Sequence, residues 1–162
     1  MFTRFSARLA KASLIASVAG LFAVVGTVSL QVFGRYVLND TPVWAESLTL
    51  VMALYVSLIG AAVGVRDAGH IGMESLLVLV PERIRLRMEM VIHVLVAIFG
   101  AMMVWNGWGL TESVKAYNIP TLGISEGFKY FPLVLSGALI ALFSVEHFIA
   151  LARGKEVVPA WH

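Results

Sequence analysis

Hydrophobic residues run through this chain in four long stretches that carry almost no charge. None of them alternates apolar and polar residues with the period of two that a membrane β-barrel requires. A helix rises about 1.5 Å per residue, so about 20 apolar residues cross a hydrocarbon core of about 30 Å. The pattern predicts an all-α integral membrane protein with a single domain over residues 1–162. Its four transmembrane helices are expected at residues 12–34, 42–65, 82–111 and 130–151.

A shorter amphipathic segment lies between the second and third predicted helices. One apolar helical face there is formed, at spacing i, i+3, i+4 and i+7, by Met73, Leu76, Leu77 and Val80. The segment is too short to span a membrane, so it predicts an interfacial helix at residues 73–80 on the cytoplasmic surface. Three arginines follow at the start of the third helix, where they are expected to bind lipid headgroups: Arg83, Arg85 and Arg87.

Composition supports lipid as the solvent for most of the chain. It is 59% hydrophobic and 14% charged, whereas soluble domains are about 45–50% apolar and about 25% charged. The absence of cysteine excludes disulfides, thiol catalysis, iron–sulfur clusters and thiolate zinc sites. A net charge of +2 is too small to indicate a nucleic-acid partner.

The distribution of lysine and arginine predicts the orientation. Of the 12 basic residues, 9 lie in the two terminal tails and the loop between helices two and three. The other loops hold only Arg35, Lys115 and Lys129. The positive-inside rule then places both termini in the cytoplasm, with a location in a bacterial inner membrane.

The N-terminus also resembles a secretory signal peptide, because basic residues precede an apolar run. A signal-peptide apolar core is usually about 7–15 residues long, whereas this run, residues 12–34, is longer. An uncleaved first helix is therefore expected.

A polar group lies at the outward end of the first two helices. Gln31, Arg35 and Asn39 share one face if the helix continues that far, and Trp44 and Glu46 follow shortly after. One interpretation is a surface that docks a partner. The other is interfacial anchoring, because tryptophan and arginine often lie at headgroup depth.

Gly60 and Gly64 form a GxxxG pair that lets helices approach closely in lipid. Packing within this chain is the favoured interpretation, and packing against another subunit is the alternative. The second helix then leads into a turn for which a structural role is expected, formed by Arg66, Asp67, Gly69 and His70.

His93 is the one ionisable residue well inside an apolar run. Such residues are functional candidates, but Glu89 is four residues earlier and offers a local structural partner. Glu146 and His147 end the fourth helix at the same depth. Two histidines at one level also raise the alternative of a haem-binding membrane cytochrome.

The chain has neither a charged residue at mid-membrane nor a pair of interrupted helices, which transporters of anions commonly use. A nucleophile–base pair and a metal cluster are also missing from its sequence pattern, so an enzyme is not expected and no cofactor is predicted. These features favour a helper subunit over a self-sufficient small transporter, which would form a homo-oligomer.

Several motifs together resemble a known family, the small membrane subunit of tripartite ATP-independent periplasmic (TRAP) transporters. The motifs are Gly-Arg-Tyr-Val-Leu-Asn at 34–39, Trp-Ala-Glu at 44–46, Gly-Ala-Ala at 60–62, Arg-Asp-Ala-Gly-His-Ile at 66–71 and Thr-Leu-Gly-Ile-Ser-Glu-Gly at 121–127. The resemblance covers nearly the whole chain. Family members often carry a second acid after Trp-Ala-Glu, and Ser47 takes that position here.

The resemblance implies a set of partners. A large TRAP membrane subunit would translocate an organic acid with sodium, and a periplasmic substrate-binding protein would deliver it. This chain would scaffold the large subunit and contribute to docking the binding protein. By this resemblance the docking residues would be Arg35, Asn39, Trp44, Glu46 and Glu126. The transported substrate is not encoded in this chain, because its site would lie on another subunit.

Overall fold

The computed structural model describes residues 2–40, 42–67 and 81–154. Its long helices are α1 Phe2–Phe33, α2 Val43–Asp67, α4 Glu82–Val114 and α5 Phe131–Ala152. All four are long and apolar enough to cross a membrane, which confirms the predicted all-α membrane fold. The predicted interfacial helix at residues 73–80, and Gly69 and His70 of the predicted turn, lie outside the described residues.

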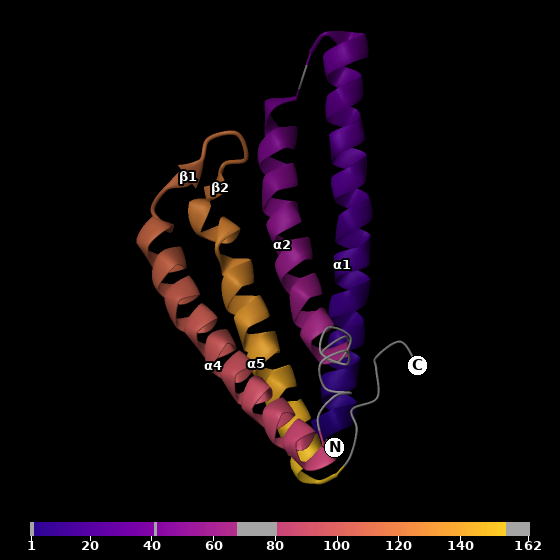
Figure 1. The fold of residues 1–162 in the computed structure, drawn as a ribbon. Helices are drawn as coiled ribbons and strands as arrows, with labels where there is room; N and C mark the ends of the chain where they lie inside the picture. The colour runs from indigo at the N-terminus through magenta and orange to yellow at the C-terminus, as the bar shows by residue number, and fades with distance from the viewer. Residues whose placement is uncertain (1, 41, 68–80, 155–162) are drawn as a thin grey trace.

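The four helices form two antiparallel pairs, α1 with α2 and α4 with α5 (Figure 1). The pairs are joined by packing of α2 on α5, so the helices follow one another in the order α1, α2, α5, α4. Figure 1 shows the pairs converging near the N-terminus and diverging toward the opposite end, where a short β-hairpin lies. We call the end where the pairs converge the clasp end, after a group of polar residues described below, and the opposite end the hairpin end.

Glycine determines how closely the helices pack within each pair. A Cβ atom on Gly137 of α5 would lie 2.8 Å from the Gly100 carbonyl oxygen of α4, and one on Gly20 of α1 would lie 2.6 Å from Val56. The predicted GxxxG pair behaves differently, because a Cβ on Gly64 would have no described atom within 4 Å and one on Gly60 only the Ser17 hydroxyl at 4.0 Å. The tight crossings inside this chain therefore use other glycines.

The hairpin end of α1 finishes in a wide turn, η1 Gly34–Leu38, which has π-helical geometry. The backbone N–H groups of Asn39 and Asp40 both donate to the Gly34 carbonyl, the second at 3.0 Å. Asn39 has a left-handed backbone conformation with φ 53°, which asparagine tolerates better than most residues. A Cβ on Gly34 would lie 2.7 Å from the Asp40 carbonyl oxygen, so this turn requires glycine there.

A β-hairpin joins α4 to α5 at the same end, with strands β1 Asn118–Ile119 and β2 Ile124–Ser125 paired antiparallel. Gly123 supplies the positive φ of 65° in its turn. A 3₁₀ turn, η2 Glu126–Lys129, then leads into α5. The Thr121 hydroxyl donates to the Ser47 hydroxyl at 2.7 Å, which ties this hairpin to α2.

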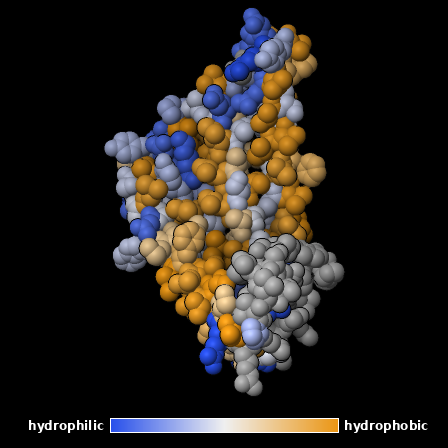
Figure 2. All heavy atoms as spheres, in the orientation of Figure 1, coloured by the Kyte–Doolittle hydropathy of each residue, from blue (hydrophilic) through white to orange (hydrophobic). Residues whose placement is uncertain are grey.

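Large apolar side chains cover the outside of the helices. Figure 2 shows apolar residues over the middle of the molecule and hydrophilic residues gathered toward its ends. Trp105 on α4 is 82% exposed and Phe22 on α1 is 74% exposed. Water would disfavour such a surface, and a bilayer favours it. Because α4 has 33 residues, its length of about 50 Å exceeds the hydrocarbon core, so the helix is tilted or protrudes.

Candidate functional site

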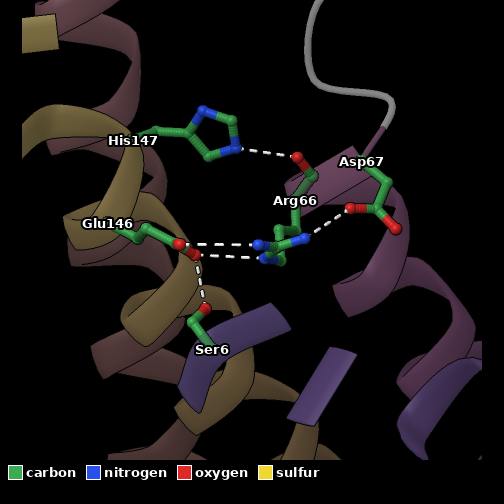
Figure 3. A network of polar contacts seen from close by, with 5 residues as sticks. All are labelled: Ser6, Arg66, Asp67, Glu146 and His147. Carbon is green, nitrogen blue, oxygen red and sulfur yellow. Dashed lines mark hydrogen bonds and ion pairs between the residues drawn. The ribbon is translucent and has the colours of Figure 1, made fainter. Parts of the chain in front are cut away.

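Arg66 is the centre of a buried polar network at the clasp end (Figure 3). It lies one residue before the end of α2 and is 3% exposed. Its Nη1 donates to Asp67 Oδ1 at 2.9 Å and its Nε donates to Glu146 Oε2 of α5 at 3.1 Å. The guanidinium also lies 6.0 Å from the centre of the Phe143 ring. One arginine therefore contacts two buried carboxylates and a buried aromatic ring.

Glu146 connects this arginine to α1. The hydroxyl of Ser6, in the second turn of α1, donates a hydrogen bond to Glu146 Oε2. Next to it, Ala10 of α1 packs on Phe143 of α5, and both are fully buried. The carboxylate thus links α1, α2 and α5. We call the group of Ser6, Arg66, Asp67, Glu146 and His147 the clasp.

Two histidines extend the clasp toward α4. His147 Nε2 lies 2.7 Å from the Arg66 carbonyl oxygen, and because a carbonyl only accepts, His147 donates there. Its ring stacks on the ring of His93 from α4, with centroids 4.6 Å apart and planes 7° apart. The rings contact each other directly and leave no space for a macrocycle between them. This geometry does not fit a haem held between His93 and His147.

The clasp is a more extensive structure than the local turn expected from the sequence. Arg66 and Asp67 pair with each other at the end of α2, but the contacts of Arg66 reach α5, and through Glu146 they reach α1. A buried charge is costly unless it is paired and hydrogen-bonded, so these residues depend on one another. The sequence contained one usable signal, since the ends of α2 and α5 both carry ionisable residues at the same depth.

Glu89 of α4 is buried beside this region. Arg85 donates to its carboxylate at 2.9 Å, one helical turn earlier. Arg85, one of the three arginines predicted to bind lipid headgroups, is thus engaged in an ion pair within α4. Arg87 is exposed, and Arg83 lies in the first turn of α4.

The predicted docking residues lie at the hairpin end, opposite the clasp. Arg35 is in η1 and Asn39 ends it, while Trp44 and Glu46 are in the first turn of α2. All four side chains are exposed. Within the described part of the chain, neither Arg35 nor Glu46 takes part in an ion pair. We call these four residues the docking face.

Glu126 differs from the docking face in having a partner. Its carboxylate accepts from Lys129 at 3.0 Å, and it occupies the first position of η2. The neighbouring Glu112 and Lys115 also pair with each other. The charges around the β-hairpin are thus paired with each other, whereas Arg35 and Glu46 of the docking face form no ion pair among the described residues.

No charged residue lies in the middle of any of the four helices. The chain has none between Lys11 and Arg35, between Glu46 and Arg66, between Glu89 and Glu112, or between Lys129 and Glu146. Among the described residues, no group of three histidines or acids is arranged to hold a metal ion. Charge is concentrated in a buried clasp at one end and on an exposed face at the other.

These features describe an integral membrane protein with a buried polar network at one end and exposed charges at the other. Comparison with known families agrees: residues 24–154 match the model of the tripartite ATP-independent periplasmic transporters, DctQ component. The chain belongs to this family. It is therefore a multi-pass membrane component of a transporter.

Two small permease proteins are among its relatives. The sialic acid TRAP transporter small permease protein SiaQ of Vibrio cholerae serotype O1 is 22% identical over 131 residues, which are 81% of this chain and 76% of the relative. The C4-dicarboxylate TRAP transporter small permease protein DctQ of the same strain is 32% identical over 81 residues, 48% of this chain and 35% of the relative.

A third relative is much longer. The sialic acid TRAP transporter permease protein SiaT of Haemophilus influenzae is 28% identical over 141 residues. The match covers 85% of this chain but only 23% of the relative. A segment similar to this chain is thus covalently part of a permease about four times as long.

Proposed function

We propose that this chain is the small accessory subunit of a TRAP-type secondary transporter in a bacterial inner membrane. It scaffolds a large membrane subunit that translocates the substrate, and its docking face helps to position a periplasmic substrate-binding protein. The transported substrate is an organic acid taken up with sodium. Both termini are in the cytoplasm, and the hairpin end faces the periplasm.

The distribution of charge is the observation that carries this proposal. An organic anion needs a binding site near the bilayer midplane, commonly at interrupted helices with polar groups or dipoles. The helices here are continuous and uncharged at mid-span, and the buried charged side chains of the described chain all lie at the clasp end. A separate chain must then supply the site, and the long relative SiaT is consistent with such a neighbour.

The unpaired charges of the docking face support a contact with a soluble partner. Arg35 and Glu46 are exposed and have no ion-pair partner within the described chain, whereas the nearby charges of the β-hairpin are paired. Charged rims of this kind set the encounter rate and the orientation of a partner. Residues needed only as membrane anchors would not require an acid and a base beside Asn39.

Transport by the complete complex tests the docking role. Arg35→Ala and Glu46→Ala should each raise the concentration of binding protein that gives half-maximal uptake by about tenfold, since 1.4 kcal/mol of lost contact energy is a factor of ten. Glu112→Ala is the matched control, because that exposed acid at the same end already pairs with Lys115. Membrane levels of all variants are measured in parallel. Unchanged half-maximal concentrations for both docking variants would refute the docking role.

A further inference from the structure

Helix α4 carries an exposed asparagine, Asn106, within its transmembrane part. The helix packs on α5 through two glycines, because Cβ atoms on Gly100 and Gly107 would lie 2.7 Å and 3.1 Å from atoms of α5. At 3.6 residues per turn, Asn106 lies about 100–120° around α4 from both glycines. It therefore faces away from α5, together with other exposed residues of α4: Leu95, Phe99, Met102 and Gly109. We call these five residues the asparagine face.

The carboxamide of Asn106 lies near the middle of the bilayer. The charge-free run of α4, residues 90–111, is about 33 Å long, which matches the hydrocarbon core. Side chains of a helix point toward its N-terminus, which for α4 is the clasp end. Accordingly, Asn106 Nδ2 donates to the Met102 carbonyl at 2.8 Å, one turn closer to the centre of the run. The amide is thus presented to hydrocarbon rather than to lipid headgroups.

One hydrogen bond does not satisfy this amide. A carboxamide has two N–H donors and an oxygen that accepts, and the bond to Met102 uses one donor. No described residue donates to Asn106 Oδ1. The exposed Thr27 and Ser29 of α1 differ, because each hydroxyl donates its single hydrogen to the carbonyl four residues earlier. An unpaired polar group in hydrocarbon is costly, so Asn106 indicates a polar contact from outside the described helices.

A helix of another protein is the occupant that fits this contact. Water is scarce at this depth, and a lipid acyl chain has no group that donates or accepts a hydrogen bond. A polar side chain on a neighbouring helix can do both, and asparagine commonly bonds across helices in lipid. Gly109, one turn from Asn106, is exposed, and a Cβ there would have no described atom within 4 Å. The backbone of a neighbouring helix can therefore approach the short asparagine side chain closely.

We infer that the asparagine face of α4 contacts a transmembrane helix of the large permease subunit. That helix is apolar except for a hydrogen-bonding side chain at the depth of Asn106. The inference rests on the proposed function, in which this chain scaffolds the larger one that supplies the transport site. It adds the face on which the two chains meet and the residue that sets their relative depth. A second copy of this chain is the alternative occupant, and the experiments distinguish the two.

Site-specific cross-linking in the assembled complex tests the assignment, because the chain contains no cysteine of its own. Phe99 and Ala101 are both exposed, and they lie about 160° apart around α4. Phe99→Cys and Ala101→Cys are labelled with a short thiol-reactive photo-cross-linker, in complexes whose large subunit has had its own cysteines replaced. Phe99→Cys should yield a covalent adduct with the large subunit, and Ala101→Cys should not. Mass spectrometry of the adduct identifies the helix reached.

Substitution of Asn106 provides an independent measurement. Asn106→Leu should lower the amount of large subunit that copurifies by about three- to tenfold, the range expected for one interhelical hydrogen bond. Asn106→Gln keeps the carboxamide and should retain most of the large subunit. Thr27→Val is the control, because that exposed hydroxyl bonds within its own helix. The isolated subunit with Asn106→Leu should unfold at no lower temperature than the unmodified one, since leucine suits hydrocarbon.

The possible outcomes separate this inference from the function on which it rests. Adducts to the large subunit from Ala101→Cys at an equal or higher yield would leave the scaffold role intact and overturn the assignment of the face. Adducts from Phe99→Cys only to lipid, or to a second copy of this chain, would overturn it as well. So would undiminished copurification with Asn106→Leu. If the unmodified chain copurifies with no large subunit, the scaffold role itself fails and the inference fails with it.

Discussion

Replacing Glu146 with alanine is the most informative perturbation of the fold. The substitution removes the carboxylate to which Arg66 and Ser6 both donate, and with it the side-chain hydrogen bonds that join Glu146 of α5 to α1 and α2. The side chains of Arg66 and Glu146 are each 1% exposed, so solvent cannot take over the lost contacts. Breaking a buried ion pair from one side typically costs about 3–5 kcal/mol.

The contacts of Arg66 indicate where in this range the cost of removing Glu146 should lie. Arg66 keeps its contact with Asp67 at 2.9 Å after the substitution, so we expect the lower limit, about 3 kcal/mol. For a chain of this size, 1 kcal/mol shifts the unfolding midpoint by about 2–4 °C, which gives a fall of about 6–12 °C. Arg66→Met should be more harmful, because it removes the guanidinium that both carboxylates contact.

The assay is thermal unfolding of the purified subunit in detergent, followed by the fluorescence of its 4 tryptophans. Glu112→Ala is the control, since its pair with Lys115 is 53–61% exposed and such pairs contribute about 1 kcal/mol or less. The control should therefore lower the midpoint by less than about 4 °C. If Glu146→Ala lowers the midpoint no more than Glu112→Ala does, the clasp does not hold the helix pairs together.

Three further results are expected. A reporter that is active only in the periplasm should be inactive when fused to the C-terminus, because the basic residues place that end inside; strong activity would reverse the orientation. The purified subunit alone in liposomes should show no sodium-driven uptake of an organic acid, since its helices are uncharged at mid-span, and measurable uptake would contradict the helper role. Changing Arg83, Arg85 and Arg87 to glutamate should lower the amount of subunit in the membrane, because each arginine contributes about 1 kcal/mol at anionic headgroups. The single change Arg87→Glu separates this effect from loss of the Arg85–Glu89 pair. Normal membrane levels of both variants would count against headgroup binding.

The membrane spans were predictable because hydrophobic length alone determines them. The second and fourth helices were predicted to start at residues 42 and 130, each one residue before the observed starts at Val43 and Phe131. The start of α1 was placed too late, at residue 12 instead of Phe2. Its first turns carry Arg4, Arg8 and Lys11, which the apolar pattern excludes, although a helix can continue into water once its apolar part is fixed.

The clasp was not predictable in the same way. Arg66 and Glu146 are 80 residues apart, so no local spacing relates them. Depth was the available clue, because the second and fourth of four successive spans run in the same direction, which places the C-terminal ends of α2 and α5 on the same side. The β-hairpin was also missed as a strand pair, since two residues per strand are too few to show a period of two.

The separation of the clasp residues along the chain has a consequence for synthesis in the membrane. Arg66 leaves the ribosome 80 residues before Glu146, which at about 5–20 residues per second is a delay of about 4–16 s. During that interval the α1–α2 pair can form by itself, with the arginine kept near the headgroups by its own charge. Only when the last helix inserts can the guanidinium leave water. We therefore expect insertion of α5 to complete the folding of the nascent chain. A ribosome that pauses before α5 would leave Arg66 hydrated and without its contact to Glu146.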